Sequence, residues 1–179
     1  MKSKRPSMAL RDLFSGSAEN TFQVQLGVAD PPLVDYVSEL LVRFLRQESV
    51  YKVRNAKGKP LDSLFEMLGE AGRRIGQAQR EVHRHIGDFA LFWAGLYPES
   101  LRDNQTQSDQ VFHQYCLHGK RSYRIASTIE SDDENAPSGD VLQRLSQEFE
   151  LCAYGLHEVR RDFERTDDGD TRVLPVIFD

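Results

Sequence analysis

The stretch that decides the fold is FALFWAGLYP, Phe89 to Pro98, a run of residues that carries no charge. The chain around it is strongly charged, because 28% of all residues are Asp, Glu, Lys or Arg. A helix that is apolar nearly all round belongs at the centre of a bundle. Asp88 stands directly before the run, and His83 and His85 precede it closely. These are therefore the ionisable groups that we expect nearest the core.

Composition narrows the class of protein. A length of 179 residues suits one domain whose core needs no disulfide or metal for support. The net charge is −5, and positive and negative residues are interspersed along the chain without a long basic stretch, which argues against a nucleic-acid partner. The longest uncharged run is far shorter than the roughly 20 residues that span a bilayer, and no apolar signal core follows the basic tip at residues 1–6.

Cys116 and Cys152 lie too far apart for a zinc knuckle and are expected to be packed thiols. We expect a cytoplasmic protein without a membrane partner.

Helical periodicity covers most of the chain and predicts a mostly α, single-domain bundle of about five helices around the central apolar helix. The first helix is expected to begin at Asp30-Pro31-Pro32, because Asp caps a helix and proline suits its first turn. The expected helices run from there to about residue 47, from 61 to a break at 72–76, and over 77–97, 108–129 and 142–163. In the last of these, seven apolar residues alternate at spacings of three and four, which is a heptad seam: Leu142, Leu145, Phe149, Cys152, Leu156, Val159 and Phe163.

Short strands are expected near both ends of the chain. Residues 21–26 alternate apolar and polar side chains, the pattern of a half-buried strand. Residues 172–178 are typical of an edge strand, because Pro175 cannot donate to a ladder, and the two could form a small strand pair. Residues 1–20 are expected to be a flexible tail, which leaves 21–179 as the helical domain. A further strand at 50–53 and a reversal at 55–58 are also predicted.

The candidate buried polar cluster lies where the central helix meets the helix over 108–129. Asp88 stands at the edge of a region expected to be dry, where a carboxylate needs a partner or becomes protonated. The second helix presents polar and small residues on its inward face, so a neighbouring helix can approach it closely. If the two helices pack together, Asp88 meets polar side chains there. The cluster comprises Asp88, Tyr115, His118, Ser122 and Tyr123.

Two interpretations of this cluster remain open. An acid, a histidine and a hydroxyl could be arranged for proton transfer or nucleophilic attack. The same residues could instead form a buried hydrogen-bond network that fixes the register of the helices. We favour the network, because residue types at helical spacing do not establish mutual geometry. Lys120, Arg121 and Arg124 are further candidate partners for Asp88.

The sequence predicts no metal site and no cofactor. His83 and His85 lie two residues apart, so on a helix they point about 160° away from each other and cannot share an ion. Glu81 and His85 have the better spacing, but the chain contains no Glu-x-x-His motif and no His-Glu-x-x-His motif. Neither a phosphate-binding glycine loop nor a Gly-x-Ser-x-Gly elbow occurs.

One segment resembles a known group of sequences. The segment from Gly87-Asp-Phe to Tyr-Pro-Glu99, followed by Tyr115, Gly119, Ser122 and Tyr123, is similar to a set of uncharacterised bacterial all-helical proteins. This resemblance implies a helical fold and suggests that Asp88, Gly95 and the later tyrosines belong to one motif. It implies no reaction, so it assigns no functional residue.

For function, we expect a cytoplasmic helical binding or regulatory module that acts on a protein or small molecule through its surface or a bundle pocket. The reason is that the strong catalytic motifs are missing, although catalytic groups can lie scattered in a sequence. The alternative is a small helical enzyme or metal-dependent protein that uses Asp88 and His118. A third hypothesis is a homo-oligomer that buries apolar surface of the first or second helix.

Overall fold

The computed structural model describes residues 6–44, 46–102 and 109–166, and within these ranges it contains helices but no β-strand. The prediction of a mostly helical fold is thus confirmed, although the number of helices is larger than the expected five or so. The elements are α1 (Pro6–Glu19), the π-helix η1 (Asn20–Gln25), α2 (Pro31–Phe44), α3 (Gln47–Val50), α4 (Leu64–Ala71), α5 (Gly76–Leu96), the 3-10 helix η2 (Pro98–Leu101), α6 (Gln110–Thr128), α7 (Gly139–Gln147) and α8 (Phe149–Thr166). None of the described helices is both long and apolar enough to cross a membrane.

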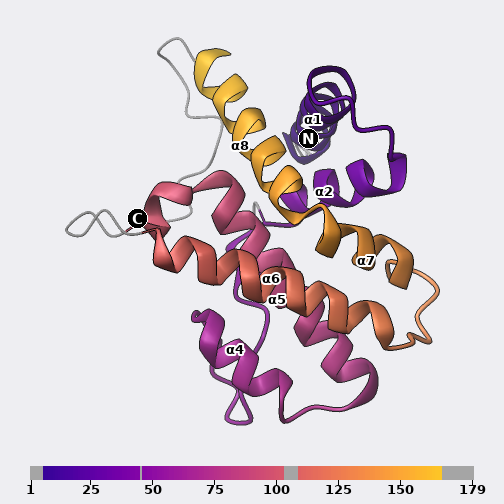
Figure 1. Ribbon diagram of the computed structural model, residues 1–179, viewed down its shortest axis with the longest axis vertical. Helices are drawn as coiled ribbons and strands as arrows, with labels where there is room; N and C mark the ends of the chain where they lie inside the picture. Colours follow the sequence, from indigo (N-terminus) through magenta and orange to yellow (C-terminus); the bar gives the residue numbers. More distant parts are fainter. Residues whose placement is uncertain (1–5, 45, 103–108, 167–179) are drawn as a thin grey trace, which may run out of the picture.

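Helix α5 is the centre of the bundle, as the apolar run predicts. Fourteen of its 21 residues are buried, and it packs against α2, α4, α6 and α8. It ends before Pro98, because proline disfavours helical geometry in the residue that precedes it. Figure 1 shows α5 and α6 side by side through the middle of the molecule, with α4 at one end and α1 and α8 at the other.

Glycines allow α5 and α6 to approach closely. A Cβ atom on Gly87 of α5 would lie 2.5 Å from the Tyr123 ring of α6. A Cβ atom on Gly119 of α6 would lie 2.6 Å from the Phe149 ring and 2.9 Å from Ala90. Real side chains do not tolerate such contacts, so both positions need the smallest residue. The aromatic rings fill the space that the missing side chains leave.

The predicted strand pair is wrong in its first half. Residues 20–25 form the π-helix η1, in which Phe22 is fully buried while Val24 is 76% exposed. The alternating apolar residues therefore do not share one buried face, and their alternation does not indicate a β-strand here. The second half, 172–178, lies outside the described residues. At 50–60 the chain makes the expected reversal, but the pairing is limited to one antiparallel bridge between Arg54 and Pro60.

The last predicted helix is two helices. The chain leaves helical geometry at Glu148, where φ is −102° and ψ is 24°, so α7 packs against α6 and α8 continues against α5. The heptad seam survives this break, because all seven of its residues are buried. The pattern thus identified the buried face correctly, although it did not locate the bend.

The structure places a helix over most of the segment for which the sequence predicts a flexible tail. Phe14 and Ala18 of α1 lie four residues apart and are both fully buried. The Phe14 ring packs edge-on against Phe163 of α8, with 4.9 Å between centroids. This contact joins an early helix to the last one and adds the N-terminal region to the core.

Candidate functional site

Asp88 is the centre of a buried polar network that joins three helices. It lies on α5 and is only 1% exposed. Its Oδ1 atom accepts hydrogen bonds from the hydroxyls of Tyr36 on α2, at 2.6 Å, and Tyr123 on α6, at 2.7 Å. Its Oδ2 atom accepts a hydrogen bond from Nη1 of Arg43, also on α2, at 3.1 Å. The burial of this charge is thus compensated by three donors.

A second arginine extends this network toward the surface. Arg84 lies one turn before Asp88 on α5, and its Nε donates to the hydroxyl of Tyr36 at 3.2 Å. Its Nη1 donates to Glu81 at 3.3 Å. The hydroxyl of Tyr36 therefore accepts from Arg84 while it donates to Asp88. We call the five residues Asp88, Tyr36, Tyr123, Arg43 and Arg84 the Asp88 network.

The pKa of every member of the Asp88 network moves away from neutrality. Burial alone would raise the pKa of Asp88, but the charges of Arg43 and Arg84 and the two tyrosine hydrogen bonds lower it overall. Burial, and then the negative charge of Asp88, raise the pKa of Tyr36 and of Tyr123. Burial would lower the pKa of both arginines, yet their interactions with Asp88 and Tyr36 raise it. At neutral pH Asp88 is ionised and the other four residues are protonated.

This protonation pattern decides what the network can do. A general acid or base works best when its pKa lies near the pH at which it operates. None of the five pKa values is shifted in that direction, and Asp88 is buried beyond the reach of a substrate. The geometry is therefore that of a structural network that holds α2, α5 and α6 in register.

Of the five residues in the predicted cluster, the structure brings only Asp88 and Tyr123 together. Ser122 lies instead beside His83, with 3.2 Å between its Oγ and the histidine Nδ1. Tyr115 stacks on Phe89, with 6.3 Å between ring centroids. The fifth residue, His118, lies elsewhere, since its ring packs edge-on against Phe65 of α4 at 5.8 Å.

Three members of the network, Tyr36, Arg43 and Arg84, are not predicted from the sequence. Arg84 stands four residues before Asp88, and this helical spacing of opposite charges is a signal that could have identified it. Tyr36 and Arg43 are seven residues apart on α2, so they lie on one face of that helix. Their partner is 52 and 45 residues away, and nothing local in the sequence indicates the contact.

The weak metal candidates Glu81 and His85 have other partners. The Nε2 atom of His85 lies 3.0 Å from the carbonyl oxygen of Val50, and burial lowers the pKa of His85 to about 4. Glu81 forms ion pairs with Arg84 and Arg80. Within residues 6–44, 46–102 and 109–166, no group of three His, Cys, Asp or Glu side chains is arranged to hold a metal ion.

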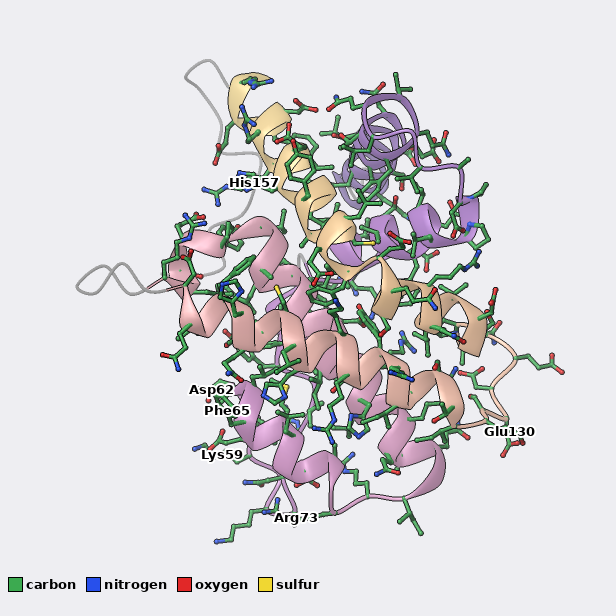
Figure 2. The ribbon with its side chains drawn as sticks, in the orientation of Figure 1. Lys59, Asp62, Phe65, Arg73, Glu130 and His157 are labelled. Atoms are coloured by element: carbon green, nitrogen blue, oxygen red, sulfur yellow. The ribbon has the colours of Figure 1, made fainter. Side chains whose placement is uncertain are left out.

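A second candidate site lies at the surface, beside α4. A hollow of about 520 Å³ opens between α3 and the loop over residues 51–62. It is lined by Glu48, Tyr51, Arg54, Lys59, Pro60 and Asp62. Figure 2 shows Lys59, Asp62 and Phe65 gathered at one end of α4. Pockets of a few hundred cubic ångströms are the size at which proteins hold small ligands or single side chains.

Half-exposed aromatic residues continue from this hollow across α6. Tyr51 packs edge-on against Phe89, at 6.4 Å, and Phe89 in turn stacks on Tyr115. Burial and the neighbouring Tyr51 raise the pKa of Tyr115. His118 lies on the same face of α6, three residues further on, and contacts Phe65, which is 62% exposed. We call Tyr51, Phe65, Tyr115 and His118 the aromatic face.

Comparison of the chain with protein-family models, with curated proteins and with solved structures gave no match.

Proposed function

We propose that the protein is a binding module and that the aromatic face, together with the hollow beside it, receives a segment of a partner protein. The observation that carries this proposal is the exposure of Phe65, which is 62% exposed to water. Its ring lies against the half-exposed His118 ring, and Figure 2 shows it close to Asp62 and Lys59, which line the hollow beside Tyr51. Aromatic residues that are partly exposed and adjacent to a cavity are typical anchors of protein interfaces.

The Asp88 network supports a binding role over the enzymatic alternative. That alternative needs Asp88 and His118 at one reacting group. Asp88 is held by Tyr36, Tyr123 and Arg43 in the core, whereas His118 packs against Phe65 near the surface. A shared proton transfer between the two residues therefore has no geometric basis. In our proposal the network keeps the helices rigid, and the partner binds elsewhere.

The proposal also includes a cytoplasmic location. Cys116 and Cys152 are buried free thiols. Burial raises the pKa of Cys116 to about 11 and that of Cys152 to about 12, so both remain protonated and poorly reactive. Unpaired buried thiols of this kind are typical of proteins from reducing compartments.

Selection from a displayed peptide library tests the proposal. Peptides are selected on the wild-type protein and then measured against Phe65→Ser and against the control Tyr154→Ser, which removes a 54% exposed aromatic residue from α8. Burying the exposed part of a phenylalanine is worth about 1.5 kcal/mol. Phe65→Ser should therefore weaken binding about tenfold, whereas Tyr154→Ser should leave it unchanged.

Both substitutions are at the surface and should change the free energy of unfolding by less than about 1 kcal/mol. Circular dichroism and urea denaturation check this before binding is compared. The proposal fails if no peptide is enriched on the wild-type protein, or if the enriched peptides bind Phe65→Ser as tightly as they bind the wild type.

A further inference from the structure

The loop beside the aromatic face concentrates positive charge in a chain that is negative overall. Residues 52–59 contain Lys52, Arg54, Lys57 and Lys59 and no acidic residue, while the whole chain carries a net charge of −5. All four side chains are exposed. The loop leads directly into the hollow, whose lining includes Arg54 and Lys59.

The four cations of this loop have no ion-pair partner among the residues that the structure describes. Arg54 donates to the carbonyl oxygen of Gly58 at 2.8 Å, which is a neutral partner. The nearby Glu70 is already shared by Arg73 and Arg74, at 3.3 and 3.1 Å. The positive charge of the loop is therefore available to a partner.

We propose that the partner segment is acidic, with an apolar side chain that contacts Phe65 and carboxylates that contact the 52–59 loop. This inference rests on the proposed function, because it specifies the chemistry of what the aromatic face receives. Complementary charge at the edge of an interface accelerates association and selects the partner, and its effect decreases as salt screens it. The aromatic face supplies the contact area, and the loop supplies the selectivity.

The same surface fits a nucleic acid less well. Glu48 and Asp62 also line the hollow, and a phosphate backbone would have to pass them. A polyanion that extends beyond the loop would further meet a molecule with a net charge of −5. A short peptide segment can limit its carboxylates to the loop and place an apolar side chain against Phe65. We therefore argue for the peptide and include the nucleic acid in the test.

The test measures the binding of four fluorescently labelled probes by anisotropy, at low and at raised salt. The first probe is an amphipathic peptide with Leu and Phe on one face and Glu on the other. The second and third replace every Glu by Gln or by Lys, and the fourth is a single-stranded oligonucleotide. The protein is used as wild type, as Lys57→Glu/Lys59→Glu, and as Phe65→Ser. A control variant, Arg161→Glu/Arg165→Glu, makes the same change in charge on α8, far from α4 (Figure 1).

The inference predicts that the Glu peptide binds the wild type about tenfold more tightly than the Gln peptide, and that raised salt removes this difference. Lys57→Glu/Lys59→Glu should abolish the preference or reverse it in favour of the Lys peptide, while the control variant should keep it. Equal binding of the Glu and Gln peptides, still sensitive to Phe65→Ser, would overturn the acidic partner but leave the proposed function standing. If the oligonucleotide binds more tightly than the Glu peptide, and Lys57→Glu/Lys59→Glu weakens its binding, the partner is a nucleic acid and the acidic peptide is overturned. Failure of all four probes to bind would overturn both proposals.

Discussion

Replacing Asp88 by Asn removes the negative charge that Arg43 meets in the core while it keeps nearly the same shape. The Asn side chain retains an oxygen for the hydroxyls of Tyr36 and Tyr123, but its amide group then faces Nη1 of Arg43, so two donors oppose each other. Removing one partner of a buried ion pair costs roughly 3–5 kcal/mol. Because the side chain of Arg43 is 32% exposed and can turn toward water, we expect the lower end, about 3 kcal/mol.

Urea denaturation measures this loss. Unfolding is followed by far-UV circular dichroism and by the fluorescence of the single tryptophan, Trp93. The midpoint should fall while the dependence on urea concentration stays constant, because the surface exposed on unfolding does not change. A control variant, Asp62→Asn, removes an exposed carboxylate and should shift the free energy by less than about 0.5 kcal/mol.

Tyr123→Phe separates the hydrogen bond from the charge. This variant removes one donor to Asp88 and should cost about 1–2 kcal/mol. In the double variant with Asp88→Asn, the two losses should sum to clearly more than the measured total, because both residues act on one network. If Asp88→Asn is as stable as the wild type or more stable, the network does not hold the helices together. Such a result would indicate a strained functional carboxylate and would revive the enzymatic alternative.

Other properties of the fold make further predictions. Burial lowers the pKa of His85 to about 4 from an ordinary 6.5, so between these pH values the unfolded state binds more protons than the folded state. The free energy of unfolding should therefore fall by about 3 kcal/mol as the pH decreases through this window. Urea denaturation at several pH values measures this dependence, and His85→Gln should reduce it. Gly87→Ala should destabilise the protein by about 2 kcal/mol, because its Cβ would lie 2.5 Å from the Tyr123 ring; Gly69→Ala, which has open space in α4, should stabilise it by about 0.5–1 kcal/mol in the same urea assay. Cys152, fully buried and with its pKa raised to about 12, should react with a chromogenic disulfide reagent only after unfolding; rapid labelling of the native protein would contradict this.

The sequence predicted those parts of the fold that depend on local pattern. The uncharged run predicts the central helix, and Pro98 predicts where it ends. The glycines between Leu68 and Gln77 predict the break between α4 and α5, where Gly76 has a φ of 59°. The seam of the last helix identified its buried face. Each of these features depends on residues within a few helical turns of one another, so the local spacing of apolar residues, glycines and prolines is enough to predict it.

The remaining features depend on contacts between distant segments. Residues 6–19 form a helix whose Phe14 packs against Phe163, a contact between segments far apart in the chain that no local pattern records. Of the Asp88 network, the sequence predicts Asp88 and Tyr123; Tyr36 and Arg43 come from a helix 45 to 52 residues away, whose contact with Asp88 has no local signal. His118 was assigned to the core because it shares a helical face with Ser122. The presence of α4 beside that face, with Phe65 against His118, changed its surroundings.

The backbone of the 52–59 loop is held by hydrogen bonds in which its three lysine side chains take no part, although Arg54 donates from its charged side chain to the Gly58 carbonyl oxygen. The side chain of Asn55 accepts from the backbone amides of Lys57 and Lys59, at 2.9 and 3.0 Å, and Arg74 donates to the backbone carbonyl of Arg54 at 2.9 Å. The lysine side chains contribute nothing to these bonds, so they can be exchanged while the backbone keeps its path. Under the proposed function, a change of partner would therefore require only a few lysine substitutions on an unaltered backbone. If the loop selects a partner as proposed, its binding preference can change in evolution without a change in the stability of the fold.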